Sequence, residues 1–155
     1  YGGYPATYLR RMSALFPDKK KCLHLFAGQV DKSQFAVHNA DCEQITIDIN
    51  PDLNPDVVGD CHDLTASFEE GEFDLILADP PYSVEDAEHY QTTMIKRNVT
   101  LKECLKVLKV GGHLVWLDQV LPQYRKINLK PIAYIGMVKS TNHRFRVITI
   151  FERIY

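Results

Sequence analysis

The chain has 155 residues, of which 45% are hydrophobic and 25% are charged, with a formal net charge of −2. This size and composition predict one globular domain spanning residues 1–155. They exclude a membrane helix, because no apolar run approaches about 18 residues, and an isoelectric point near 6.3 excludes binding of duplex DNA by bulk charge alone.

Hydrophobic patterning predicts seven strands and two well-defined helices along the chain. In chain order these are a helix over 4–16 ended by Pro17, strands over 22–26, 45–49, 57–58 and 73–79, a helix over 99–108 stopped by Gly111-Gly112, and strands over 113–117, 132–138 and 146–154, the last two joined by a turn at 140–143. Only a short helix near 33–40 fits between the first two strands, and about seven residues separate the second from the third. The early crossovers are therefore expected to be short.

Near-continuous apolar strands are typical of a sheet covered on both faces. We therefore predict an α/β fold: a Rossmann-like, mostly parallel seven-stranded sheet with an antiparallel last strand and helices on both faces. Ligands bind such sheets at the carboxyl ends of the strands. Five positions fall at or just past predicted strand ends and are expected to line one rim: Gly28, Asp48, Asp60, Asp79 and Asp118.

The charges are unevenly distributed. Residues 41–88 contain 15 acidic residues and no Lys or Arg, so the rest of the chain holds all 18 basic residues and five acidic ones. The basic part could contact nucleic acid. An alternative of at least equal weight is that lysines such as Lys102, Lys106 and Lys109 only form the solvated face of a helix.

Four cysteines, Cys22, Cys42, Cys61 and Cys104, occur singly with no CxxC pair. This usage predicts reduced thiols and a cytoplasmic protein, and the first residues lack the basic start and apolar stretch of a signal peptide. We expect no metal site, the alternative being a zinc site that uses some of the six histidines.

Several of these segments together resemble a known enzyme family. Leu25-Phe26-Ala27-Gly28, Asp48, Gly59-Asp60 and Asp79-Pro80-Pro81-Tyr82 resemble class I S-adenosylmethionine-dependent methyltransferases, and more narrowly the amino-methyltransferases that include adenine-N6 DNA enzymes. The resemblance covers about residues 22–117 and the two-strand tail. It implies an enzyme that uses S-adenosylmethionine, although this chain has one glycine after the first strand where many relatives have two.

The cofactor-binding residues are expected at the first three strand ends and at Asp79. Gly28 lets backbone approach a ligand closely, although a glycine here is also a plain turn residue. Asp48 stands where a carboxylate can accept both ribose hydroxyls, or merely cap the turn before Asn50-Pro51. The resemblance implies that Asp60 accepts the adenine amino group, the alternative being a cap for a helix over 61–67 with Asp63 as a rival. The full predicted set is Phe26, Ala27, Gly28, Asp48, Ile49, Asp60, Cys61, His62 and Asp79.

The catalytic prediction is the tetrad Asp79, Pro80, Pro81 and Tyr82. An amino nitrogen attached to a π system is a weak nucleophile because its lone pair is delocalised. The Asp79 carboxylate and the Pro80 carbonyl can accept its two N–H bonds, and consecutive prolines hold the carbonyl direction fixed. Tyr82 offers a flat face on which a planar substrate can stack. The alternative is a proline-terminated strand followed by an incidental tyrosine.

Substrate contacts are predicted at Tyr82 and Ser83 and in the last turn, at Asn142, His143 and Arg144. That turn mixes polar, basic and aromatic side chains, but a hairpin turn needs no function of its own. Trp116 is expected in the core, with Asp118 and Gln119 at the edge of the pocket.

The leading hypothesis is an N-methyltransferase acting on an exocyclic amino nitrogen, with adenine N6 in DNA favoured over RNA. A base in duplex DNA would have to leave the stack to reach Tyr82. The chain has no room for a separate target-recognition domain, so a protein partner, a single-stranded substrate or weak sequence preference is expected. The alternatives are an RNA base amino-methyltransferase and a non-catalytic subunit that binds the cofactor.

Overall fold

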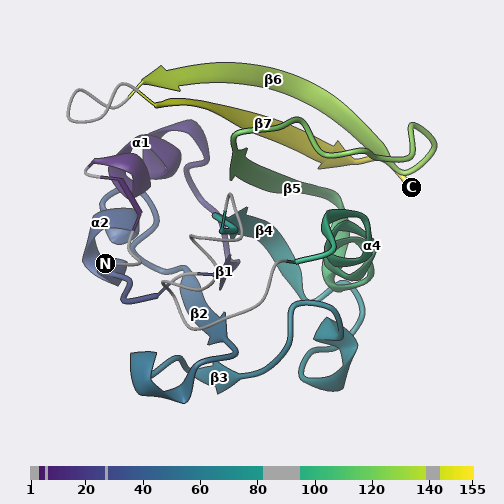
Figure 1. Cartoon of the computed structure of the whole chain (residues 1–155). Helices are drawn as coiled ribbons and strands as arrows, with labels where there is room; N and C mark the ends of the chain where they lie inside the picture. The colour runs from purple at the N-terminus through teal and green to yellow at the C-terminus, as the bar shows by residue number, and fades with distance from the viewer. Residues whose placement is uncertain (1–3, 6, 27, 82–94, 139–143) are drawn as a thin grey trace.

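The computed structural model describes residues 4–5, 7–26, 28–81, 95–138 and 144–155 (Figure 1). Its strands form one seven-stranded sheet in the order β3-β2-β1-β4-β5-β7-β6. Their bounds are Lys21–Leu25 (β1), Glu43–Asp48 (β2), Val57–Val58 (β3), Phe73–Ala78 (β4), Leu108–Asp118 (β5), Leu129–Val138 (β6) and Phe145–Arg153 (β7). All seven predicted strands are confirmed, with ends that differ by a few residues.

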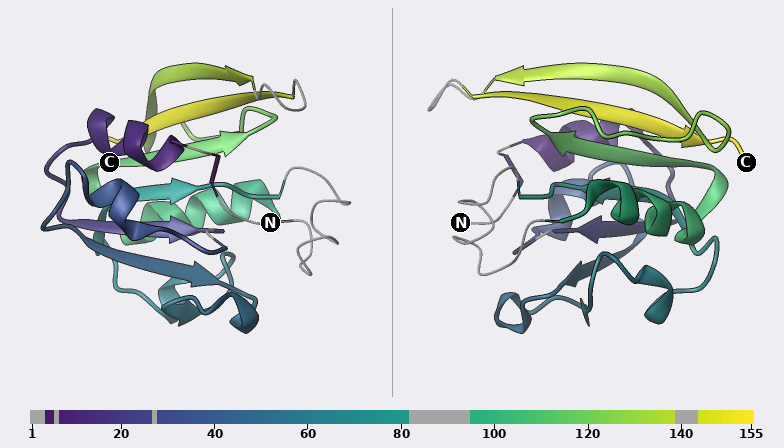
Figure 2. Two further views of the ribbon diagram at one scale, coloured as in Figure 1. Left: turned by 90° about the vertical axis from the view of Figure 1, so that its left-hand side faces the viewer. Right: turned by 45° about the vertical axis from the view of Figure 1, so that its right-hand side comes forward.

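The sheet is mostly parallel. β1 pairs in parallel with β2 and β4, β2 with β3, and β4 with β5, whereas β7 runs antiparallel between β5 and β6. The predicted Rossmann-like arrangement with an antiparallel last strand is therefore confirmed. Figure 2 shows β6 and β7 as a long ribbon along one edge of the sheet.

Helices cover both faces of the sheet, as predicted (Figure 1). Helices α1 (Tyr8–Leu15) and α2 (Lys32–Ala36) lie on one face, and α4 (Arg97–Val107) lies on the other with the 3-10 helix η2 (Leu64–Ala66). The early crossovers are short, since α2 has five residues and only the 3-10 helix η1 (Pro51–Leu53) stands between β2 and β3. None of the described helices is long and apolar enough to cross a bilayer.

Each face of the sheet carries its own hydrophobic core. Under α1 and α2, Leu9 and Met12 pack with Leu75, Leu77 and other inward-facing residues of β4, β5 and β7. Under α4, the fully buried Trp116 belongs to the second cluster, together with other residues of β1, β4 and β5. Trp116 is thus a core residue, as predicted. Because both faces are buried, the central strands read as continuous apolar runs.

One predicted boundary and one predicted stop signal were wrong for backbone reasons. The first helix begins at Tyr8 rather than Tyr4, because Thr7 has a left-handed φ of 65°. Helix α4 ends at Val107, and Gly111-Gly112 lies inside β5 instead of stopping the helix. Gly111 has a φ of +82° there, and a Cβ on Gly112 would lie 2.9 Å from the carbonyl oxygen of Lys109. These glycines serve an irregular strand start, which periodicity alone does not reveal.

Candidate functional site

The carboxyl ends of five strands meet at one rim of the sheet. The strand order places the ends of β3, β2, β1, β4 and β5 side by side, and the order of the strands along the chain reverses between β1 and β4. Open α/β sheets bind ligands at this switch point. Gly28 follows β1 and Asp79 follows β4, so the two predicted residues flank the switch point.

The end of β1 has an unusual backbone. Phe26 has a φ of 62° and Gly28 a φ of 54°, both in the left-handed region. For a non-glycine residue this conformation is costly, and such residues cluster at functional sites. The amide N–H of Asp79 donates to the carbonyl oxygen of Leu25 at 3.4 Å, which ties the end of β4 to this turn. Ala27 lies outside the described residues.

A cavity of about 210 Å³ borders the loop that follows β1. It is lined by Tyr4 and Thr7 from the N-terminal segment, by Gln29 to Asp31 from the loop, and by Gln34 from α2. Sequence reasoning assigned no role to these residues, because their contact depends on how the N-terminal segment folds back. The cavity thus lies between the N-terminal segment, this loop and α2.

Asp48 ends β2 and is only partly exposed. Its Oδ1 accepts the backbone N–H of Asn50 at 2.9 Å, and Asn50 in turn accepts from Asp52 at 3.0 Å. The turn role considered for Asp48 is therefore present. The turn hydrogen bond uses only Oδ1 of Asp48. Because both oxygens of a carboxylate can accept hydrogen bonds, this turn is compatible with a ligand contact. The neighbouring Ile49 is exposed, which leaves its side chain at the surface of the rim.

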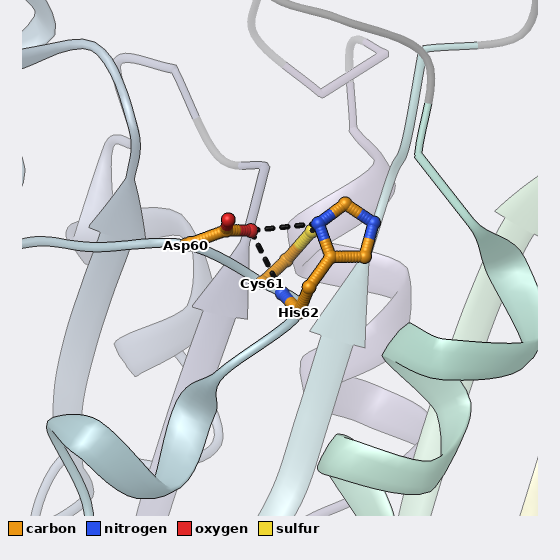
Figure 3. A group of neighbouring side chains, drawn as sticks. All are labelled: Asp60, Cys61 and His62. Atoms are coloured by element: carbon orange, nitrogen blue, oxygen red, sulfur yellow. Dashed lines mark hydrogen bonds and ion pairs between the residues drawn. The ribbon is translucent and has the colours of Figure 1, made fainter.

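Asp60 follows β3 and is held by His62 (Figure 3). Its Oδ1 accepts the backbone N–H of His62 at 2.9 Å and the ring Nδ1–H of His62 at 2.7 Å. The bond from the His62 backbone N–H is the main reason that the pKa of Asp60 is lowered, so this group stays a carboxylate. The alternative, a cap for a helix over 61–67, is not what Asp60 does: only residues 64–66 are helical, and their N-cap is Asp63.

Three side chains of the kind that bind metals have ligand atoms within 4.8 Å of one another: Asp60, Cys61 and His62. The atoms that would bind a metal are nevertheless already in contact with other protein groups. Burial raises the pKa of the Cys61 thiol to about 12, and the Thr100 hydroxyl donates to its sulfur at 3.5 Å. A metal needs the thiolate and a free imidazole nitrogen, whereas both ring nitrogens of His62 make protein hydrogen bonds. All four cysteines of the chain are free thiols.

The structure describes three of the four residues of the predicted catalytic tetrad. Asp79 is partly buried, and Pro80 and Pro81 are buried at the end of β4. Two tyrosines from the N-terminal segment lie within electrostatic reach of Asp79. Burial raises the pKa of Tyr8 well above its usual value, with the Asp79 carboxylate adding to it, and the pKa of Tyr4 is raised in the same way. Tyr82 lies outside the described residues.

A buried series of hydrogen bonds connects Tyr4, His24 and Gln44, and the sequence did not predict it. The fully buried His24 contacts the hydroxyl of Tyr4 through Nδ1 at 3.2 Å and Gln44 Oε1 through Nε2 at 2.9 Å. Because the Gln44 oxygen can only accept, Nε2 carries the proton and Nδ1 accepts from Tyr4. Burial lowers the pKa of His24 to about 4, so the ring is neutral. Tyr4 also stacks on Tyr8 at 5.2 Å between ring centroids.

The structure corrects one rim residue. Asp118 was expected at the edge of the pocket, but it has no exposed surface and accepts hydrogen bonds from Arg97, Trp116 and the backbone of Gln119. Its oxygens are occupied by the protein, so it is a structural carboxylate. Gln119 is exposed. Of the predicted substrate residues, Arg144 is exposed and directly precedes β7, whereas Ser83, Asn142 and His143 lie outside the described residues.

No protein-family model and no curated protein matches this sequence, but solved structures match its fold. The N-methyltransferase NodS from Bradyrhizobium japonicum WM9 is 16% identical, with 96% of this chain and 94% of that chain covered and a TM-score of 0.65. TrmN from Thermus thermophilus is 16% identical with a TM-score of 0.65, and the match covers 94% of this chain but only 47% of TrmN. An rRNA methylase from Streptococcus thermophilus is 9% identical, with 94% of each chain covered and a TM-score of 0.60. These likenesses show that the chain has the Rossmann-like fold of solved methyltransferases.

Proposed function

We propose that this chain is an S-adenosylmethionine-dependent N-methyltransferase, with residues 1–155 forming its catalytic domain. The observation that carries the proposal is the placement of Asp48, Asp60 and Asp79 at the ends of three strands of one rim, with the β1 turn between them. The structure of NodS in complex with S-adenosyl-L-homocysteine supports the choice of cofactor.

The rim fits this cofactor in size and chemistry. Three inter-strand spacings separate β3 from β4, which amounts to about 14 Å. An adenosine joined to an amino-acid chain spans such a distance. Asp60 would accept from the adenine amino group, Asp48 would accept from the ribose hydroxyls, and the left-handed turn at Phe26 and Gly28 would face the remainder. When bound, the cofactor supplies an electrophilic methyl group on a sulfonium.

Asp79 and Pro80 would activate the nucleophile. The carboxylate and the carbonyl accept the two N–H bonds of an amino group, which localises the nitrogen lone pair for attack. The buried prolines hold this geometry before substrate arrives, so little reorganisation is needed. In the transfer a nitrogen–carbon bond forms as the sulfur–carbon bond breaks, and the alkylated nitrogen loses its extra proton to water.

The favoured substrate is the N6 amino group of adenine in DNA, for which Tyr82 and Ser83 would contact the base, and Asn142, His143 and Arg144 would contact the DNA strand. A protein partner would then supply target recognition. A base amino group in RNA is the second candidate, favoured by the likeness to an rRNA methylase. Labelled methyl transfer to pools of DNA, RNA and protein separates these candidates, and a non-catalytic subunit would label none of them alone.

Calorimetry with S-adenosyl-L-homocysteine tests the cofactor site. We expect Asp48→Asn to weaken binding about 10- to 100-fold, because it removes charge-assisted hydrogen bonds. The amide oxygen of the introduced side chain can still accept from Asn50, so the turn is retained. Asp52→Asn, at an exposed acid in the same turn, is the matched control and should leave binding unchanged.

The role of Asp79 is tested by separating transfer from binding. Asp79→Ala should abolish methyl transfer while S-adenosyl-L-homocysteine binding stays within about threefold, because the proposed role acts on the nucleophile. Equal loss of transfer and binding contradicts that role.

A further inference from the structure

The segment that carries Asp60 is joined to helix α4 at three points. The Glu103 carboxylate accepts the backbone N–H of Leu64 at 3.0 Å, and the Thr100 hydroxyl donates to the Cys61 sulfur at 3.5 Å. At the third point, the backbone N–H of Lys96 donates to Nε2 of His62 at 2.9 Å. Of these three contacts, the third involves the side chain that also holds Asp60.

The hydrogen bonds of His62 fix the tautomer of its ring. Nε2 accepts an N–H from the backbone of Lys96, so it carries no proton. Nδ1 therefore carries the proton and donates it to Oδ1 of Asp60 at 2.7 Å, the contact drawn in Figure 3. A neutral imidazole with the proton on Nδ1 is thus the form that satisfies both partners at once.

Lys96 stands at the start of α4. It is the N-cap of this helix, and its carbonyl oxygen accepts from the backbone N–H groups of Val99 and Thr100 at 3.0 Å. In the sequence it closes the segment that begins with Asp79-Pro80-Pro81-Tyr82. Its side chain forms no cap hydrogen bond, and its backbone N–H is held by His62.

We propose that His62 is a positioning residue that links the adenine-binding carboxylate Asp60 to the start of α4. This inference rests on the proposed function, since it takes Asp60 as a cofactor contact. Both ring nitrogens of His62 bond to the protein, so the role proposed for this side chain is to hold Asp60. A ligand that holds Asp60 would thereby steady the backbone of Lys96.

Two substitutions separate the two halves of the link. The amide nitrogen of His62→Asn stands near the position of Nδ1, so this variant keeps a donor for Asp60 and loses the acceptor for Lys96. The amide oxygen of His62→Gln reaches the position of Nε2, so this variant keeps the acceptor and loses the donor. His62→Phe removes both, and His38→Asn, at an exposed histidine on the other side of the sheet, is the control.

Three measurements on the whole chain test the proposal. The ¹⁵N resonances of the imidazole should report the Nδ1–H tautomer at neutral pH. S-adenosyl-L-homocysteine should bind His62→Gln and His62→Phe about 3- to 10-fold more weakly than the wild type, the loss of one hydrogen bond, with His62→Asn close to wild type. Amide exchange at Lys96 should be faster in His62→Asn and His62→Phe, and ligand should slow it in the wild type but not in His62→Phe.

The outcomes separate this inference from the proposed function. A wild-type chain that fails to bind S-adenosyl-L-homocysteine overturns the cofactor proposal, whereas the tautomer and the Lys96 exchange of the free protein still test the link. If the wild type binds but His62→Phe matches it in affinity and in Lys96 exchange, the link is overturned while the function stands. A uniform loss of stability in all three His62 variants, with ligand still slowing exchange at Lys96 in His62→Phe, also overturns it.

Discussion

Arg97 and Asp118 form an ion pair with two contacts: Nε lies 2.7 Å from Oδ2, and Nη2 lies 3.1 Å from Oδ1. The pair joins the first residue of α4 to the last residue of β5. Asp118 is fully buried, and it also accepts from the indole N–H of Trp116 at 3.0 Å. The carboxylate is therefore saturated with donors, and it fixes the helix against the rim.

Removing either partner of this pair should destabilise the protein. Arg97→Ala leaves a buried carboxylate without its cation, so we expect the free energy of unfolding to fall by about 3 kcal/mol. Urea denaturation measures this change. Lys32→Ala, at the exposed pair with Asp56, is the comparison and should cost about 0.5 kcal/mol. Similar losses in the two variants would show that the burial of Asp118 adds nothing.

Two buried hydroxyls have no hydrogen-bond partner within the part of the chain that the structure describes: those of Tyr8 and Thr149. A buried polar group without a partner carries its full desolvation cost. Tyr8→Phe and Thr149→Val should therefore each raise the free energy of unfolding by about 1 kcal/mol, measured by thermal and urea denaturation. A loss of stability in either variant would mean that the hydroxyl has a partner after all.

Gly112 should not tolerate a side chain. A Cβ there would lie 2.8 Å from Cδ1 of Leu108, 2.9 Å from the Lys109 carbonyl oxygen and 3.1 Å from the Asp74 carbonyl oxygen. Two of these atoms are backbone, so Gly112→Ala should destabilise by about 2 kcal/mol. Gly136→Ala is the matched change in β6, where only the exposed Phe145 ring must shift, and it should be nearly neutral. Thermal melting of the two variants side by side decides the matter.

Stability should rise with pH between about 4 and 6.5 because of His24. Burial lowers the pKa of this residue to about 4 in the folded chain, whereas the unfolded value is about 6.5. In this window the unfolded chain binds the extra proton, so acid favours unfolding, and the loss at the acid end is roughly 3 kcal/mol. Urea denaturation from pH 7 to 5 should show this slope in the wild type and a flatter one in His24→Gln. Equal slopes would contradict the assignment to His24.

The fold was predictable because its strands carry strong local signals. In β4 the run 75–78 is apolar on both faces and is followed by Asp79 and two prolines, and strand ends of this kind mark the rim of a parallel sheet. The placement of Asp48, Asp60 and Asp79 followed from those strand ends. The stop role predicted for Gly111-Gly112 was wrong because two glycines have the same appearance in a helix stop and in an irregular strand.

The remaining site geometry depends on contacts between distant residues. Lys96 and His62 are 34 positions apart and Arg97 and Asp118 are 21 apart, so no local sequence pattern reveals either contact. Asp118 and Asp79 both lie at the carboxyl ends of neighbouring strands, Asp118 as the last residue of β5 and Asp79 directly after β4, but Trp116 and Arg97 donate to the oxygens of Asp118. The packing of α4 against β5 therefore makes Asp118 a structural carboxylate.

Strand β3 contains two residues and joins the sheet through β2 alone, with Ile47 beside Val57 and Asp48 beside Val58. So short a ladder can separate from its neighbour without unfolding the remainder of the molecule. The part of the proposed site that would hold adenine thus follows an edge strand that pairs with the sheet at two positions, and a bound ligand would add contacts to this edge. Solvent exchange of the Val57 and Val58 amides should accordingly track ligand concentration rather than global stability.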